Sequence, residues 1–377
     1  MSIFFDYASG SPLHPDVMTE MQQYFIKDSV NIASSHHDAN HLRSTMMSAL
    51  EDIGQRLQLD HRGLVVTSGA TESINQCIIG AVHFYSHHKK VHLMTSKAEH
   101  SVSLRIFKYL ESQGHQVTYI DVDQDGLIDL DAVKSAVRPD TLLASFHHIN
   151  NETGVVQPVQ SLIELLKSQG ILVHIDASQS IGKVPAMYGS WEADYISFCT
   201  HKAQGPIGIG LLYHAQQPLR HFAPLIHGKG VGKRPGTFPM ALFMGMCKAI
   251  QIAENNDIEY VQTLKNIFLS QLDPAICLTT KTDQCIPHII NLYCKDVFND
   301  LMQAALPQYI FSTGSACNSQ SHQPSHVLKA MGRTLDQIDC SLRISFHHMQ
   351  SKTMVKTFAQ ALNKAYFKLT KLLPDEY

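Results

Sequence analysis

A lysine on a tight loop is the residue of this chain whose setting most favours covalent chemistry. Lys202 lies between the apolar run 195–198, which predicts the end of a buried strand, and the run 207–213, which predicts the next strand. Gly205-Pro206 predicts a turn between them. A half-buried lysine amine in its neutral form can condense with an aldehyde. A lone lysine on a loop is usually an ordinary surface residue, so other parts of the chain must supply the remaining contacts of an aldehyde cofactor.

Two polar segments could hold the other groups of such a cofactor. Thr67 to Ser73 follows a predicted strand and opens a helix, where backbone N–H groups attract a phosphate and Gly69 lets the main chain come close. Asp176 follows the apolar run Ile-Leu-Val-His-Ile, and a carboxylate there could keep a pyridine nitrogen protonated. Each feature alone is explained as well by a helix cap. Their order around Lys202 favours pyridoxal phosphate.

Gln179 and His100 complete this candidate constellation. Gln179 lies one helical turn after Asp176 and could reach a phenolic oxygen of the cofactor. The flat ring of His100 could stack on the cofactor face, and its nitrogens suit proton transfer near neutral pH. None of these residues is informative by itself, and the combination predicts a cofactor-dependent enzyme.

Apolar, β-rich runs alternate with amphipathic helical runs, and this alternation is typical of a mainly parallel α/β sheet. The predicted strands are 63–67, 91–95, 117–121, 142–146 and 171–175, and the predicted helices are 72–88, 102–113, 129–137 and 159–168. Helical runs also dominate 14–58, around a polar stretch at 31–40. Ligands of such sheets gather at the carboxyl ends of the strands, which is where the polar residues named above stand.

The chain is long enough for two domains, with 377 residues. We expect residues 14–250 to form a large α/β domain that binds the cofactor. Residues 1–13 and 251–377 are expected to form a smaller α+β domain, because short strands and helices replace the regular alternation after about residue 250.

Composition favours small-molecule chemistry in the cytoplasm. The formal net charge of −3 gives no reason to expect nucleic acid or an anionic membrane as a partner. The eight cysteines contain no Cys-x-x-Cys pair, which favours a reduced protein, and neither a signal peptide nor a membrane span is expected. The 23 histidines show no ligand spacing, so no metal site is expected.

The motifs, taken together, resemble those of the cysteine desulfurases, pyridoxal-phosphate enzymes of the class V aminotransferase group. They look most like the branch that serves iron-sulfur cluster assembly and nitrogenase maturation. The matching segments are 6–8, 67–73, 99–100, 150–156, 176–180, 201–206, 234–237, 315–317 and 342–346. The resemblance implies fold type I of the pyridoxal-phosphate-dependent transferases. Its large domain carries a seven-stranded, mainly parallel sheet, and its smaller α+β domain carries the loop of Cys317.

The resemblance also implies a role for each matching residue. Lys202 would bind the cofactor's aldehyde, Asp176 its pyridine nitrogen and His100 its ring face. The other expected contacts are Gln179 and Asn151 at the phenolic oxygen, and Thr71 and His201 at the phosphate, which Thr237 reaches across the subunit interface. Ala70 is expected to bind the cofactor as well. Arg343 and Asn151 are expected at the substrate carboxylate. A homodimer follows, because the family completes its site across a two-fold interface.

Cys317 decides which reaction the resemblance implies. It lies in Phe-Ser-Thr-Gly-Ser-Ala-Cys-Asn-Ser, a small and polar segment in which a buried structural thiol would pack poorly. In the expected reaction Lys202 removes the α-proton of L-cysteine and the Cys317 thiolate attacks the substrate sulfur. The reaction leaves a persulfide on Cys317, releases L-alanine, and passes the sulfur to an acceptor or scaffold protein. Help from His100 or the substrate amine is expected in forming the thiolate.

Cys199 departs from the family pattern, because a serine hydroxyl usually binds the phosphate at this position. Loss of one such bond costs about 1–3 kcal/mol, so weaker cofactor retention is expected unless the neighbouring Thr200 offers a hydroxyl. Two other functions stay open. One is a lyase acting on selenocysteine or another β-substituted amino acid, and the other is a degenerate desulfurase fold kept as a binding scaffold. The pathway that receives the sulfur, whether iron-sulfur clusters, transfer-RNA thiolation or DNA modification, also stays open.

Overall fold

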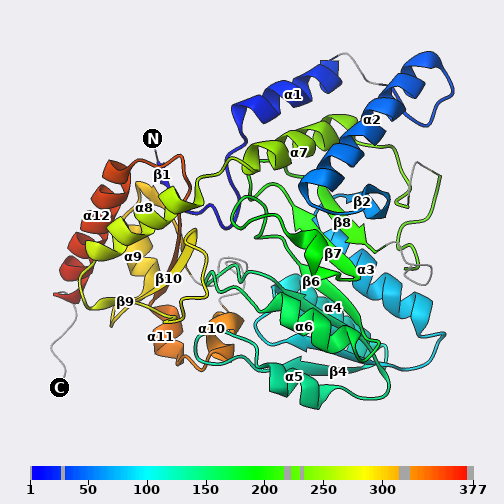
Figure 1. Ribbon diagram of the computed structural model, residues 1–377. Helices are drawn as coiled ribbons and strands as arrows, with labels where there is room; N and C mark the ends of the chain where they lie inside the picture. Colours follow the sequence, from blue (N-terminus) through cyan, green and yellow to red (C-terminus); the bar gives the residue numbers. More distant parts are fainter. Residues whose placement is uncertain (1, 27–29, 216–221, 230–232, 314–322, 372–377) are drawn as a thin grey trace.

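A seven-stranded sheet forms the centre of the computed structural model, which describes residues 2–26, 30–215, 222–229, 233–313 and 323–371 (Figure 1). The strands, in their order across the sheet, are β2 (Leu64–Thr67), β8 (Gly210–His214), β7 (Tyr195–Cys199), β6 (Leu172–Asp176), β5 (Thr141–His147), β3 (His92–Ser96) and β4 (Gln116–Ile120). Only β8 is antiparallel to its neighbours, and the pairs from β7 to β4 are parallel. The predicted mainly parallel α/β fold is confirmed.

Helices cover both faces of this sheet (Figure 1). On one face α3 (Ala70–Tyr85) and α4 (Ser101–Ser112) share an apolar core with the strands. The other face packs against α2 (His37–Arg56), α6 (Val159–Lys167) and α7 (Met240–Ala253). The flanking helices are α1 (Pro15–Ile26), which packs on α7, and α5 (Leu130–Ala136), which packs on α6.

Alternation along the strands decides which side chains reach the α3 face. In β6, Val173 and Ile175 enter the core with α2, α6 and α7, whereas Leu172 packs on the α3 side. Successive side chains of a strand point to opposite faces, so Asp176 lies on the same face as Leu172. The β6 carboxylate is therefore placed beside α3.

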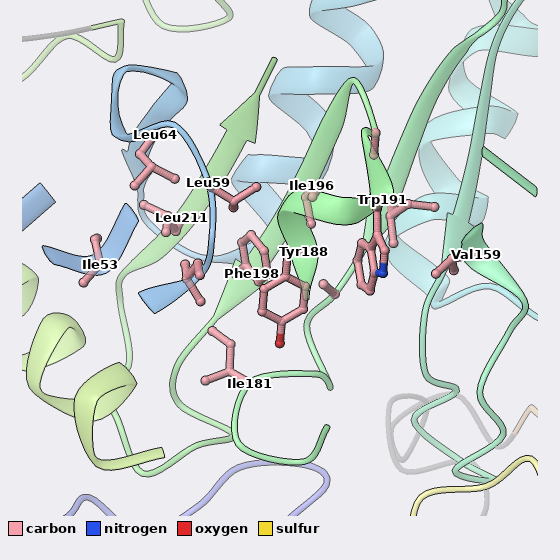
Figure 2. Close-up of a cluster of buried hydrophobic side chains, with 14 of the residues drawn as sticks. Ile53, Leu59, Leu64, Val159, Ile181, Tyr188, Trp191, Ile196, Phe198 and Leu211 are labelled. Carbon is pink, nitrogen blue, oxygen red and sulfur yellow. The ribbon is translucent and has the colours of Figure 1, made fainter. Parts of the chain in front are cut away.

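An aromatic cluster fixes the neighbouring strand β7. Figure 2 shows Tyr188 and Trp191, from the short 3-10 helix η2 (Tyr188–Trp191), packed near Ile196 and Phe198. The ring centroids of Tyr188 and Phe198 lie 4.9 Å apart in an edge-on arrangement, which is a favourable geometry for aromatic pairs. This cluster holds the strand that leads into the Lys202 loop.

A second, four-stranded antiparallel sheet lies beside the first (Figure 1). Its strands, in order, are β12 (Ser312–Thr313), β13 (Ser341–Ser345), β10 (Ile289–Cys294) and β9 (Ile276–Leu278). The remaining elements here are α8 (Ile258–Ser270), α9 (Asn299–Ala305), α10 (His326–Ala330), α11 (Leu335–Asp339) and α12 (Lys352–Thr370). The N-terminal strand β1 (Ile3–Phe4) pairs in parallel with β11 (Tyr309–Ile310). The domain boundaries at 14 and 250 stay a prediction.

The predicted elements occur within a few residues of their expected ends. The predicted strand 207–213 begins only at Gly210, because the chain is still turning at Gly208, where φ is +90°. A short 3-10 helix, η1 (His61–Gly63), precedes β2. Among the described helices, none has the length and apolar character that a bilayer crossing needs.

Candidate active site

A cavity of about 480 Å³ opens at the carboxyl edge of the seven-stranded sheet. It is lined by the turn before α3, the start of α4, the ends of β5, β6 and β7, the N-terminal arm, and one residue of β13. Nine of the predicted site residues line it: Ala70, Thr71, His100, Asn151, Asp176, Gln179, His201, Lys202 and Arg343. These residues are distant in sequence, and the two sheets bring them together.

Asp176 ends β6 as a buried carboxylate with prearranged donors. The backbone N–H of Ser178 donates to its Oδ1 at 2.9 Å, and the Ser178 hydroxyl donates to the same oxygen. Burial alone would raise the pKa of Asp176, but these hydrogen bonds and the nearby His100 lower it below its ordinary value. The carboxylate is therefore held as an anion, which suits pairing with a protonated ring nitrogen.

The turn before α3 provides an anion subsite. Gly69 occupies the N-cap position with φ of +155°, and a side chain added there would meet no atom within 4 Å. No side chain caps α3, so its first backbone N–H groups are available to an anion. Gly210 makes this turn possible, because an added Cβ at Gly210 would lie 2.5 Å from the Gly69 carbonyl carbon.

The Lys202 loop is tightly held. The backbone N–H groups of Ala203 and Gly205 both donate to the carbonyl of Thr200 at 2.8 Å. Gly205 is required there, because an added Cβ would lie 2.5 Å from the Thr200 side chain. Ser11 of the N-terminal arm donates its N–H to the His201 carbonyl at 2.7 Å and its hydroxyl to the Lys202 carbonyl at 3.2 Å.

His201 and His100 are both uncharged at neutral pH. Burial and the neighbouring Lys202 lower the pKa of each to about 4. Nδ1 of His100 accepts the backbone N–H of Val102 at 3.3 Å, which caps α4. The neutral His100 ring therefore carries its proton on Nε2.

Arg343 reaches the cavity from β13. Its Nη1 donates to the Asn151 carbonyl at 2.9 Å, while Nη2 donates to Asp6 Oδ1 at 2.8 Å and to the Ser9 hydroxyl at 2.5 Å. Its buried Nε has no hydrogen-bond partner in the described part of the chain. A planar guanidinium fixed in this way suits a carboxylate ligand.

The cysteine that departs from the family pattern does face the cavity. Cys199 is buried, lines the cavity, and donates its thiol to the Ser178 carbonyl at 3.4 Å. Thr200 does not compensate, because its buried hydroxyl is not part of the cavity wall. The suggestion that Thr200 replaces the missing serine hydroxyl finds no support in this arrangement.

One described site residue, Thr237, is not part of this cavity wall. Thr237 lies in a neighbouring groove with Met47 of α2, Ser68 and Arg234, so it does not line the cavity of its own chain. Cys317 lies outside the described residues. The roles predicted for both residues stay predictions.

Several residues that line the cavity or hold its side chains have no predicted role. Asp6 and Ser9 hold Arg343, and Ser178 holds Asp176; Asp6 and Ser178 belong to the motif segments 6–8 and 176–180. An acid followed two residues later by serine is a turn signature that could have indicated Ser178. The Asp6 contact spans 337 positions and carries no local signal.

A buried acid and histidine flank the cavity as well. His147 lines it, and its Nδ1 lies 2.9 Å from Glu99 Oε1, which also accepts the Ser96 hydroxyl at 2.8 Å. Burial opposes a charge on His147, but the Glu99 carboxylate outweighs it and raises the pKa. No group of three or more His, Cys, Asp or Glu residues in the described ranges could hold a metal ion.

The cavity fits pyridoxal phosphate. An uncapped helix N-terminus with an open glycine position suits the phosphate, and the buried anionic Asp176 suits the ring nitrogen. Lys202 and Arg343 also line this cavity, and Arg343 comes from β13 of the second sheet.

Comparisons with known proteins agree with this chemistry. The aminotransferase class-V family model matches residues 3–358. The chain is 37% identical to cysteine desulfurase IscS of Vibrio cholerae and 35% identical to that of Dechloromonas aromatica; each match covers 99% of this chain, and 95% and 94% of the respective relatives. A solved NifS-like protein is 28% identical with a TM-score of 0.91, over 98% of this chain and all of that one. The structure titled SspA in complex with cysteine is 30% identical with a TM-score of 0.83, over 93% of this chain and all of that one.

The match over nearly the whole length, together with the nine predicted residues that line one cavity, settles the family. This chain belongs to the class-V aminotransferase family and, within it, to the cysteine desulfurases, which are pyridoxal-phosphate enzymes.

Proposed function

We propose that this protein converts L-cysteine to L-alanine and carries the released sulfur on Cys317 as a persulfide. The observation that carries the proposal is the convergence of Lys202, Asp176, His100 and Arg343 on one cavity. A binding scaffold would have no need for an amine, a buried carboxylate and a fixed guanidinium in a single cavity of this kind.

Pyridoxal phosphate, when bound, supplies an electron-accepting ring that makes the substrate's α-proton removable. In the proposed roles, Arg343 binds the substrate carboxylate and so orients the α-carbon. Lys202 then takes the α-proton on Nζ. Asp176 stays anionic throughout because of its Ser178 hydrogen bonds.

His100 would act as a hydrogen-bond donor rather than as a base. Its Nδ1 is already occupied by the Val102 N–H, so the proton of the neutral ring lies on Nε2. An N–H group can stabilise a thiolate or a departing sulfur, but it cannot accept a proton. The thiol proton of Cys317 would then go to another acceptor, such as the amine of the substrate.

The sulfur step is balanced without an added oxidant. The Cys317 thiolate bonds to the substrate sulfur while the bond between that sulfur and Cβ breaks. The electron pair of the broken bond stays on the carbon skeleton, which is protonated and leaves as L-alanine. The product on Cys317 is a persulfide, which a thiol of an acceptor protein can remove.

The cellular setting is part of the same proposal. The seven cysteines that the structure describes are free thiols, which supports a reducing compartment such as the cytoplasm. The persulfide would pass to an acceptor or scaffold protein for iron-sulfur cluster or thio-cofactor synthesis. The position of Thr237 outside its own chain's cavity supports a homodimer in which the partner supplies this residue.

The experiment that tests the proposal measures alanine and sulfide released from L-cysteine in the presence of a thiol reductant. The parent protein is compared with Cys317→Ala and with a matched control, Cys277→Ala, which removes an exposed thiol on β9. We expect equal amounts of alanine and sulfide from the parent and the control, and loss of both products in Cys317→Ala.

The other outcomes are informative. Retained activity in Cys317→Ala would show that sulfur leaves without a relay, as in a lyase. Absence of product and of a bound yellow chromophore in the parent would contradict the proposed enzyme itself.

A further inference from the structure

Lys183 is a buried lysine that the proposed chemistry does not use. It ends the turn that follows β6, four residues after Gln179, and only 6% of it is exposed. Its Nζ donates a hydrogen bond to Oε1 of Gln179, a residue of the cavity wall. No carboxylate in the described ranges forms an ion pair with it, so this buried amine has no anionic partner among the described residues.

Apart from the Cys199 thiol, the groups around Lys183 are cations or neutral bases. Those that influence it or are influenced by it are Lys202, His201 and Cys199 of the lysine loop, Arg343 and His347 at the end of the second sheet, and His288 before β10. Burial, followed by the charges of Lys202 and Arg343, lowers the pKa of Lys183 to about 7, while Cys199 acts in the opposite direction. Burying an amine without an anionic partner is energetically unfavourable. Because Lys183 lies beside a cavity suited to an anionic ligand, its burial indicates a role in binding that ligand.

Lys183 also decides which end of the Gln179 amide faces the cavity. In this contact Lys183 Nζ donates to the amide oxygen of Gln179, and an ammonium, which has no lone pair, permits only this orientation. On the other side, Gln179 Nε2 donates to the Ala8 carbonyl at 2.8 Å. One N–H of the Gln179 amide is committed to Ala8, and the second remains available to a ligand in the cavity.

We propose that Lys183 is a positioning residue that turns the Gln179 amide N–H toward the phenolic oxygen of the cofactor and places a cation behind it. The proposal deepens the proposed function and rests on it. The expected result is tighter binding of the anionic cofactor and a bound chromophore that loses its proton at lower pH, since a nearby cation disfavours the protonated form.

The test uses the full chain and measures the dissociation constant of pyridoxal phosphate and the pH dependence of the bound cofactor's absorption. Lys183→Met should weaken binding about 10-fold and move the absorption change about one pH unit upward. Lys265→Met is the matched control, because Lys265 is a half-buried lysine whose pKa is also lowered by burial but which does not line the cavity. The control should bind the cofactor as the parent does.

A double-mutant cycle separates positioning from a general charge effect. In a Gln179→Ala background, Lys183→Met should change the dissociation constant less than about 3-fold, because the group that it positions is gone. If Lys183→Met changes the dissociation constant equally in both backgrounds, the positioning role is overturned. It is also overturned if Lys183→Met alone changes neither the dissociation constant nor the pH dependence of the cofactor's absorption.

The thermal unfolding midpoint of the cofactor-free protein is the control that shows whether each variant folds. Removal of a buried amine without an acidic partner should leave this midpoint unchanged or raise it. Gln179→Glu tests the same contact with Lys183 in place, because it substitutes an acceptor for the N–H, and it should weaken binding at least as much. Parent-like binding by Gln179→Glu would overturn the proposal, whereas a parent that binds no cofactor would contradict the proposed function instead.

Discussion

The polar side chains of the cavity are held in place by protein contacts before any ligand arrives. Asp176 is held by Ser178, and Arg343 by Asp6 and Ser9. Such contacts reduce the reorganisation that binding would otherwise require. At the scale of single residues, the site is therefore prearranged for an anionic, ring-shaped ligand and a carboxylate.

The charge on Asp176 should be essential for the reaction. Asp176→Asn keeps the shape and removes the anion that would keep the ring nitrogen protonated. We expect the turnover number to fall about 100-fold or more, at saturating cofactor and L-cysteine. Asp129→Asn is a suitable control, because Asp129 caps α5 outside the cavity. Turnover within a few-fold of the parent in Asp176→Asn would contradict this role.

Cys199 should limit how tightly the cofactor is held. Cys199 lines the cavity at the position where the family pattern has a serine hydroxyl, and a thiol is a weaker donor than a hydroxyl. Cys199→Ser should lower the dissociation constant of pyridoxal phosphate about 2-fold to 10-fold, measured by equilibrium dialysis. Cys247→Ser alters another buried thiol, outside the cavity, and should leave the constant unchanged. Weaker binding by Cys199→Ser would show that the thiol is the better fit.

The residues of the site could be predicted where their motifs are local, and not where they depend on distant partners. Asp176, His100 and Lys202 follow strands or precede helices in recognisable motifs. Lys183 has no such motif, and its importance becomes visible only when the turn places Nζ on Gln179 and buries it. The arm residue Asp6 meets Arg343 only after both sheets have formed.

At the scale of elements, the short helix α10 is anchored to the cavity region by a buried acid. Ser325, the N-cap of α10, donates its hydroxyl to Glu152 Oε2 at 2.5 Å. This serine lies close in sequence to the segment of Cys317. The contact therefore fixes one element that flanks the proposed sulfur carrier.

Glu152 should make stability depend on pH. Burial raises its pKa to about 7 from an ordinary value of 4.5, so the folded protein binds this proton more tightly than the unfolded chain. The contribution is fully present below about pH 4.5 and is lost as pH rises through about 7. Between pH 5 and 8, the parent should lose about 2 kcal/mol of unfolding free energy relative to Glu152→Gln.

Urea unfolding at both pH values measures this difference. Glu164→Gln, on the exposed side of α6, is the control and should show no such change with pH. A constant difference between Glu152→Gln and the parent would contradict the proposed linkage.

The order of strands and helices was predictable because periodicity is a local property, but the direction and start of β8 were not. Its predicted first residues, 207–209, form part of the turn instead, since Gly208 adopts φ of +90°. The reversal of β8 depends on its pairing with both β2 and β7, which lie far apart in sequence. Pairing partners of this kind leave no mark on the strand's own residues.

At the scale of the whole molecule, the cavity is built from parts of the chain that are distant in sequence and belong to different structural units. The large sheet supplies Asp176 and the Lys202 loop, the second sheet supplies Arg343, and the N-terminal arm closes one side through Ala8. The arm is pinned at its start by β1 and β11. Cavity shape therefore depends on how the two sheets are held together.

The position of Thr237 leads to a prediction about assembly. Thr237 lies in the groove beside α2, whereas Lys202 lies in the cavity, so a dimer that shares its sites would need one residue from each chain. Lys202→Ala and Thr237→Ala should each impair a homodimer. Co-expressed with different tags and purified as a mixed dimer, they should form one complete site, from Lys202 of one chain and Thr237 of the other. We expect the mixed dimer to recover about half of the parent's high-affinity pyridoxal phosphate binding and desulfurase turnover, because one of two sites is intact.

Light scattering should give twice the chain mass of 42.1 kDa. If the mixed dimer binds cofactor and turns over no better than the average of the two variant homodimers, Thr237 serves the cavity of its own chain. A monomer in solution would contradict the shared site altogether.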